Sequence, residues 1–260
     1  MNQEQLAKHF AAMGARVRFR QLEQRSRSSW DDSEPPKFTI DIQRDRKGEF
    51  FDFAMGPEAP EFKLLQAKPK DRHLLLLTND GQRFLCGHDE RHWFVSGVKK
   101  TVSNVRDAKQ ALLPDEIWEQ LKNLPPDEVD NRRNAVFKRQ GEWYFVPSQR
   151  EIPDHLVLKD EPLQRTAVSK PHVCQELYRE GGELVYIVGR EQMTEEEYTE
   201  RKAEDPDFDR IGLRTMVRNP VVYARGYVRH DDHATIKLDG WHRVFINAEV
   251  TGSETIQFLD

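Results

Sequence analysis

A first set of residues able to do chemistry lies in the segment CGHDERHWF, at positions 86–94. Its candidate metal ligands are Cys86, His88 and His92, and thiolate and imidazole are ligand types that suit zinc. The spacing Cys-x-His-x₃-His supplies three members, whereas a structural zinc site needs four, and it matches neither a zinc finger nor a helical His-Glu-x-x-His motif. A polar turn between two strands is the competing interpretation.

A second set lies in the segment RHDDH, at positions 229–233. His230 and His233, helped by Asp231 or Asp232, combine imidazole with carboxylate, as metal-dependent hydrolases and nucleases do. The two histidines stand at the ends of an expected turn and can approach each other. The competing interpretation is a turn whose aspartates accept hydrogen bonds from backbone amides.

The expected strand register separates His242 from this second set. The dipeptide Asp239-Gly240 favours a two-residue hairpin, which places His233 opposite Ile246. His233 and His242 then lie four residue steps apart along the sheet, about 13 Å at 3.3 Å per step. We therefore expect the imidazoles near the carboxyl end to be too scattered to bind one ion jointly, which favours a binding protein over an enzyme.

A third set is basic and alternates with apolar residues near the amino end. Guanidinium groups bind phosphates and aromatic rings stack on bases, so this pattern predicts contact with single-stranded nucleic acid. The arginines are Arg16, Arg18, Arg20, Arg25 and Arg27. A solvated strand and loop of ordinary charge is the competing interpretation, because the whole chain carries a net charge of −5.

Cys174 lies in a segment, 171–180, that we expect to form a helix ended by Gly181-Gly182. The thiol would then sit in the first helical turn, two positions after His172. Because side chains two positions apart on a helix do not face each other, we expect a buried core thiol there and not a thiol–imidazole pair.

The elements that position these residues predict an α+β fold with two small domains, each an antiparallel sheet with flanking helices. Residues 1–122 form the first domain, the Pro- and Asp-rich stretch 123–134 is the linker, and 135–260 form the second domain. Apolar periodicity predicts the other helices at 2–13, 103–113 and 114–122, and the capping box of Thr194 and Glu197 predicts an acidic helix from 194 to about 204. Alternating apolar residues on either side of the turn-rich stretch 44–48 predict a hairpin over 38–53. The second domain is expected to end in a β-meander of the runs 221–229, 233–238 and 241–247.

Composition limits the possible classes of protein. The chain has 260 residues, of which 33 % are charged, and a mean hydropathy of −0.81, and it has no apolar run near the length of roughly 18 residues that a membrane helix needs. We therefore expect a cytoplasmic protein with no membrane partner. Two cysteines 88 positions apart exclude a disulfide scaffold. The glycine-rich nucleotide motifs, the Gly-x-Ser-x-Gly elbow and the kinase signatures are missing from the sequence.

The segments CGHDERHWFVSGV, RQGEWYFVP and GYVRHDDHATIKLDGWHRVFINAE resemble stretches of bacterial proteins of unknown function, and this resemblance implies no activity. The leading hypothesis is an intracellular, non-catalytic accessory protein that binds a macromolecular partner, most simply another protein. The first alternative is a metal-dependent hydrolase, acting on nucleic acid or another substrate, with a divalent metal as its cofactor. The second alternative is single-stranded nucleic-acid binding through the arginine strand.

Overall fold

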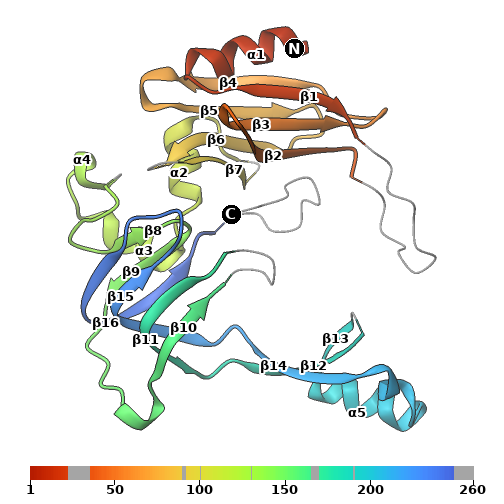
Figure 1. Ribbon diagram of the computed structural model, residues 1–260, viewed down its shortest axis with the longest axis vertical. Coiled ribbons are helices and arrows are strands. Elements are labelled where there is room, and N and C mark those ends of the chain that lie inside the picture. The colour runs from red at the N-terminus through yellow and green to blue at the C-terminus, as the bar shows by residue number, and fades with distance from the viewer. Residues whose placement is uncertain are drawn as a thin grey trace.

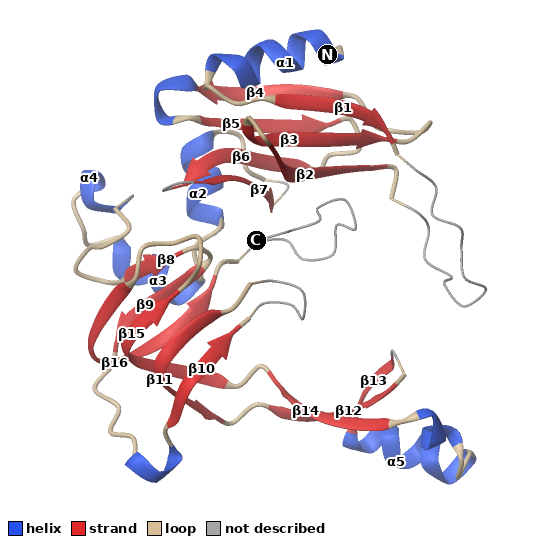
Figure 2. Cartoon of the chain, in the orientation of Figure 1, coloured by secondary structure: helices blue, strands red, loops and turns tan. Residues whose placement is uncertain are grey.

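The computed structural model describes residues 1–22, 36–89, 92–99, 101–129, 131–164, 170–189 and 191–248. Its α-helices are α1 Gln3–Ala12, α2 Val105–Ala111, α3 Asp115–Leu121, α4 Pro126–Val129 and α5 Glu195–Glu204. The strands of the first half are β1 Val17–Gln21, β2 Phe38–Asp45, β3 Gly48–Met55, β4 Phe62–Lys68, β5 His73–Thr78, β6 Arg83–Asp89 and β7 His92–Val98. Those of the second half are β8 Lys138–Gln140, β9 Trp143–Pro147, β10 Leu158–Leu163, β11 His172–Glu180, β12 Glu183–Val188, β13 Glu191–Thr194, β14 Leu213–Arg218, β15 Val221–Arg229 and β16 Ile236–Ile246. The fold is α+β, with strand predominating (Figure 2).

The first half holds two sheets, ordered β1-β3-β2 and β4-β5-β6-β7, which share one aromatic core. The helix α1 covers this core with Leu6 and Phe10, and its capping box at Asn2 supplies partners for the free amides of the first turn (Figure 1). The expected helix at 2–13 and the expected hairpin of β2 and β3 are thus confirmed. The strand β1 pairs with β3 in parallel, not antiparallel, orientation.

The second half is built on a six-stranded antiparallel sheet with the order β10-β11-β15-β16-β9-β8. Side chains from β9, β10, β11, β15 and β16 enter a single core cluster. The helix α3 packs Ile117 and Leu121 against Phe137 and Tyr144 beside β9. This sheet carries His172 at the start of β11 and leads directly into the turn that holds His230 and His233.

A three-stranded sheet, β13-β12-β14, and the helix α5 form an arm that extends from the six-stranded sheet (Figure 1). The helix α5 begins after Thr194, whose side chain and that of Glu197 make the expected capping box. Tyr198 of this helix stacks on Tyr186 of β12, with ring centroids 4.3 Å apart. Among the described residues, no helix is long and apolar enough to cross a membrane.

The helix expected over 171–180 is wrong, because the segment forms the strand β11. It lies between β10 and β15 and pairs with both in antiparallel register. Its side chains include good helix formers such as Glu176 and Leu177, so the pairing partners on both sides override the local preference. Gly181-Gly182 does not end a helix; it links this sheet to the arm.

The hairpin expected at Asp239-Gly240 is also wrong. The strand β16 runs unbroken from Ile236 to Ile246. Its pairing with β15 passes from Leu238 opposite Gly226 to His242 opposite Ala224, so extra residues of β16 bulge out between these pairs. Gly240 has φ +91°, a conformation that suits a bulge as well as a tight turn, and the dipeptide alone therefore does not distinguish the two.

Candidate metal centre

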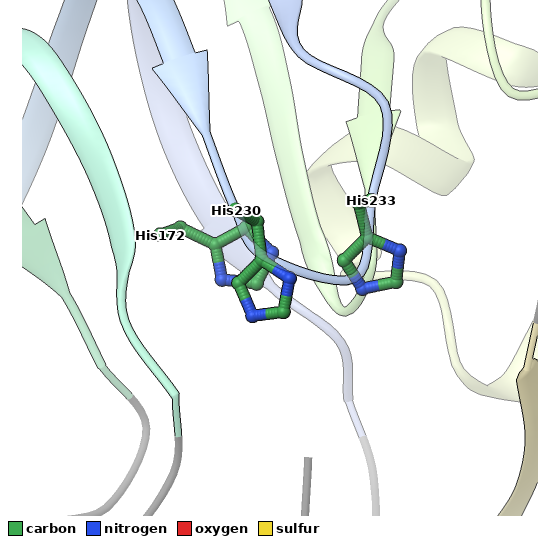
Figure 3. A group of neighbouring side chains, drawn as sticks. All are labelled: His172, His230 and His233. Atoms are coloured by element: carbon green, nitrogen blue, oxygen red, sulfur yellow. The ribbon is translucent and has the colours of Figure 1, made fainter.

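Three histidines, His172, His230 and His233, come together at one end of the six-stranded sheet (Figure 3). One ring nitrogen from each lies within 4.8 Å of the corresponding nitrogens of the other two. His172 opens β11, His230 directly follows β15, and His233 lies in the turn before β16. In the described part of the chain this is the one group of three or more histidine, cysteine or acidic side chains close enough to share an ion.

Strand register explains why His172 and His230 face each other. Val173 pairs with Arg229, so one further step of the antiparallel ladder places His172 opposite His230. Because side chains alternate between the two faces of a strand, both imidazoles lie on the face that carries Cys174 and points into the core. Their ring centroids are 4.1 Å apart with an interplanar angle of 25°.

His172 is the most buried of the three, with 1 % of its surface exposed. Neither of its ring nitrogens has a hydrogen-bond partner. Burial, together with the neighbouring His230 and His233, lowers the pKa of His172 to about 2. The ring is therefore neutral at physiological pH, the form that binds a metal ion. A buried imidazole with two unpaired nitrogens is rare enough in proteins to require an explanation, and a role in binding a metal ion would be one.

The hairpin of β8 and β9 holds the turn that carries the other two histidines. Gln140 is fully buried, and its side-chain nitrogen donates hydrogen bonds to the carbonyl oxygens of Ala234, at 2.7 Å, and Val228, at 3.3 Å. These carbonyls stand on either side of the His230–His233 turn. Gly141 follows with φ +58°, and a β-carbon added to it would lie 3.1 Å from Nε2 of His172 and 3.0 Å from Nε2 of His233. Gln140 is thus a positioning residue for the group.

The three rings lie nearly parallel, with interplanar angles of 23° to 30°. Ligand nitrogens on one tetrahedral zinc ion, each about 2.0–2.1 Å from the metal, are about 3.3 Å apart. The observed limit of 4.8 Å is wider, so the outermost nitrogens must approach by about 1.5 Å to share an ion. The rings of His230 and His233 are the ones that would move, because they are half-buried whereas His172 is buried.

The two aspartates of the turn are not members of the group. Asp231 is exposed, and Asp232 forms an ion pair with Lys170. The backbone amide of Asp232 instead donates a hydrogen bond of 3.1 Å to Nδ1 of His230. With Nδ1 accepting, the proton of the neutral ring resides on Nε2, so metal binding by His230 must displace either this hydrogen bond or that proton.

The residues of the first predicted set are not brought together. Cys86 and His88 lie on one face of the hairpin of β6 and β7, whereas His92 pairs with Asp89 on the other face. Cys86 is fully buried, and burial raises the pKa of its thiol, which opposes the thiolate form that metals bind. The ring of His88 packs edge-on against Trp93.

His92 instead lies near the histidine group, with its ring centroid 6.3 Å from that of His233. Its Nδ1 is hydrogen-bonded to Oε1 of Glu49 in β3. His242 stays outside the group, as expected from its separation along the strand: it is buried opposite Pro147, and its Nδ1 contacts the carbonyl oxygen of Gly240 at 2.9 Å. The premise of that expectation, the Asp239-Gly240 hairpin, does not hold.

The arginine strand carries its own counter-ions. Arg16 and Arg18 pair with Asp45, at 2.6 and 3.4 Å, and Arg20 pairs with Asp52 at 2.6 Å. Arg16 and Arg18 also lie over the ring of Phe50. Arg25 and Arg27 lie outside the described residues.

Sequence reasoning noticed His172 but did not assign it to the site, because it placed the residue in a helix. If the segment 172–180 is taken as a strand that pairs with 221–229, His172 lies opposite His230. This pairing was the signal that could have identified His172 as a member of the site. Comparison of the chain with family models, with curated proteins and with solved structures gives no match. The proposals below therefore rest on the residues described above.

Proposed function

We propose that this protein binds a divalent transition-metal ion through His172, His230 and His233. The observation that supports it best is the buried imidazole of His172, which has no hydrogen-bond partner and faces two further imidazoles. Desolvating a polar group without a partner costs about 1–3 kcal/mol, and a metal ion at the centre of the group would remove that cost for one of the two ring nitrogens of His172. The proposal uses His230 and His233 from the second predicted set and replaces its aspartates with His172.

The ligand set points to a class of ion. Imidazole nitrogens suit zinc, copper, nickel and iron, whereas magnesium and calcium require oxygen ligands, which these three residues do not supply. Zinc is the simplest member of this class because it has no redox chemistry and accepts a tetrahedral set of nitrogens. We therefore use zinc as the probe in the experiments below.

Three protein ligands leave one position of a tetrahedral ion to be filled. Water in that position would make a catalytic site, in which the metal lowers the pKa of the water and generates a nucleophile for hydrolysis. A fourth side chain would close the site and make it structural. The fourth ligand therefore separates the hydrolase hypothesis from the non-catalytic accessory protein.

The test is zinc binding by the purified chain, measured by titration against a chelating indicator after metal removal. We expect one ion per chain, and we expect His172→Ala, His230→Ala and His233→Ala each to lower the affinity at least 100-fold. His155→Ala is the matched control, because His155 is an exposed histidine outside the group. Absence of stoichiometric binding by the wild-type chain, or equal loss in His155→Ala, would contradict the proposal.

A second candidate function, protein binding by the arm, has a separate observation in its favour. Exposed apolar side chains gather on β12 and β14, namely Leu184, Leu213, Met216 and Val217. Leu184 and Val217 form a cross-strand pair, and β14 is the edge of its sheet within the described residues. Edge strands of this kind add a strand from another chain, and the simplest such chain is a second copy. A wild-type dimer that becomes monomeric in Val217→Asp, measured by light scattering, would support it; a wild-type monomer would oppose self-association.

The division into domains 1–122 and 135–260 with a linker at 123–134 remains a prediction, and so does the identity of any macromolecular partner.

A further inference from the structure

We propose that His92 is the fourth ligand of the ion, so that the bound metal joins the two halves of the chain. This inference rests on the metal centre proposed above. His92 lies at the start of β7 in the first half, whereas His172, His230 and His233 belong to the second half. It is the histidine of the first half whose ring contacts the group, at 6.3 Å between the centroids of His92 and His233.

The distance suits a ligand that closes on an ion. Two imidazoles bound to one tetrahedral zinc ion have ring centroids about 5 Å apart. The separation of 6.3 Å exceeds this by about 1 Å. The nitrogens of His172, His230 and His233 exceed their expected spacing on one zinc ion by a similar distance, about 1.5 Å. The rings of His92 and His233 are nearly perpendicular, at 86°, so the His92 ring does not join the parallel stack of the other three.

Glu49 prepares His92 for this role. One carboxylate oxygen of Glu49 contacts Nδ1 of His92, and the other accepts a hydrogen bond of 2.9 Å from the backbone amide of Trp93. The carboxylate is thereby fixed in place, and it holds the proton of the neutral imidazole on Nδ1. Nε2 then carries the lone pair, which is the arrangement found where a carboxylate orients a metal-binding histidine.

Ion pairs already hold the tip of the β6–β7 hairpin against the second half. Asp89, which pairs with His92 across the hairpin, contacts Arg132 and lies 3.3 Å from Arg139. Arg139 in turn donates a hydrogen bond of 2.7 Å to the carbonyl oxygen of Gly141. A β-carbon added to Gly141 would meet the rings of His172 and His233, so this residue lies next to the group. The hairpin is therefore positioned beside the histidine group by contacts that do not depend on the metal.

Four protein ligands make a closed site. Such a site leaves no position for a reacting water, so the ion would act as a structural link between the halves and not as a hydrolytic catalyst. Metal binding would then change the stability of both halves, because binding energy that depends on ligands from each is available only when both are folded and docked. This outcome agrees with a non-catalytic protein.

The test compares zinc binding and hydrogen exchange in the wild-type chain, His92→Ala, Glu49→Gln and His172→Ala. We expect zinc to slow exchange in β6–β7 and in β11–β15 of the wild type. In His92→Ala we expect 10- to 100-fold weaker binding and slower exchange in β11–β15 alone. Glu49→Gln should weaken binding about ten-fold, the effect of disturbing an orienting partner. His92→Gln replaces His92→Ala if the latter does not fold without metal.

The outcomes distinguish failure of the His92 proposal from failure of the metal centre itself. Equal affinity of wild type and His92→Ala, with zinc still protecting β6–β7 in the variant, overturns the role of His92 and leaves the three-histidine centre intact. Wild-type chain that binds no zinc overturns both. Binding that is lost in His172→Ala and weakened, but not lost, in His92→Ala supports both.

Discussion

Gly141 lies directly against the imidazole of His172: a methyl group on its α-carbon would stand 3.1 Å from Nε2 of His172 and 3.0 Å from Nε2 of His233. The backbone of Gly141 has φ +58°, a conformation that residues with a side chain rarely adopt. The hairpin of β8 and β9 therefore reaches the histidine group at a position where a side chain would require the two rings to shift by a few tenths of an ångström. A substitution at Gly141 therefore tests the geometry of the site without removing a ligand.

Gly141→Ala is expected to lower both stability and zinc affinity. The control is Gly81→Ala, because Gly81 has φ +92° but open space around its α-carbon. Positive φ costs a residue with a side chain on the order of 1–3 kcal/mol, so both variants should lose that much free energy of unfolding in urea. Only Gly141→Ala should also bind zinc more weakly, since its methyl group displaces the rings. Equal zinc affinity in the two variants would show that the hairpin does not shape the site.

A pair of carboxylates provides a prediction about pH. Asp41 and Asp52 lie opposite each other on β2 and β3, and both are buried. Burial raises the pKa of Asp41, and the charge of Asp52 adds to the rise, although hydrogen bonds from Gln43 and the amide of Ile42 oppose it. A raised folded-state pKa means that Asp41 costs stability once pH rises through that value. Asp41→Asn should therefore stabilise the protein at pH 7, by about 1 kcal/mol or less, and not at pH 3.

Asp45 provides the opposite control. The hydrogen bond from Arg16 lowers the pKa of Asp45 to about 2. Its contribution to stability is therefore present above the unfolded-state pKa of 3.8 and is lost as pH falls toward 2. Asp45→Asn should destabilise the protein at pH 7 and have little effect at pH 2. Urea unfolding of Asp41→Asn and Asp45→Asn between pH 2 and 7 measures how the free energy of unfolding of each variant depends on pH. If both variants gain stability at pH 7, or both lose it, the opposite pKa shifts of Asp41 and Asp45 are contradicted.

Local signals in the sequence were sufficient where neighbouring residues determine the structure. Thr194 and Glu197 begin α5 by hydrogen bonds within a single turn, so the capping box was visible without any tertiary information. The β2–β3 hairpin was visible for the same reason, because its strands adjoin each other in the chain.

The histidine group was not predictable in this way. His172 meets His230 only because β11 pairs with β15, a partner some fifty residues further along the chain that local preference does not specify. The hairpin expected at Asp239-Gly240 failed for a related reason, since β15 pairs with β16 on both sides of Gly240 and β9 pairs with it from His242 onward, which leaves Gly240 in a bulge and not in a turn. The site could be predicted in part, as His230 and His233, but its third member depended on strand order.

The arginine strand provides the last prediction. If single-stranded nucleic acid binds there, Arg18 is the best residue to remove, because its side chain is 56 % exposed and its contact with Asp45 is long, at 3.4 Å. Arg20 is a poorer choice, since its loss would leave the buried carboxylate of Asp52 without its ion-pair partner. Binding of a labelled oligothymidine, followed by anisotropy at several salt concentrations, should weaken in Arg18→Ala, and the slope of log affinity against log salt should fall by about 0.7 per lost phosphate contact.

The same assay should show stronger binding in Asp45→Asn, because that substitution releases Arg16 and Arg18 from their common counter-ion. Arg210→Ala, which removes an equal charge from an exposed position near the arm, is the control and should change neither affinity nor slope. If Asp45→Asn and Arg18→Ala also leave both unchanged, the arginines serve only to pair with Asp45 and Asp52. In that case the positive charge of β1 stabilises the first sheet and contributes nothing to recognition.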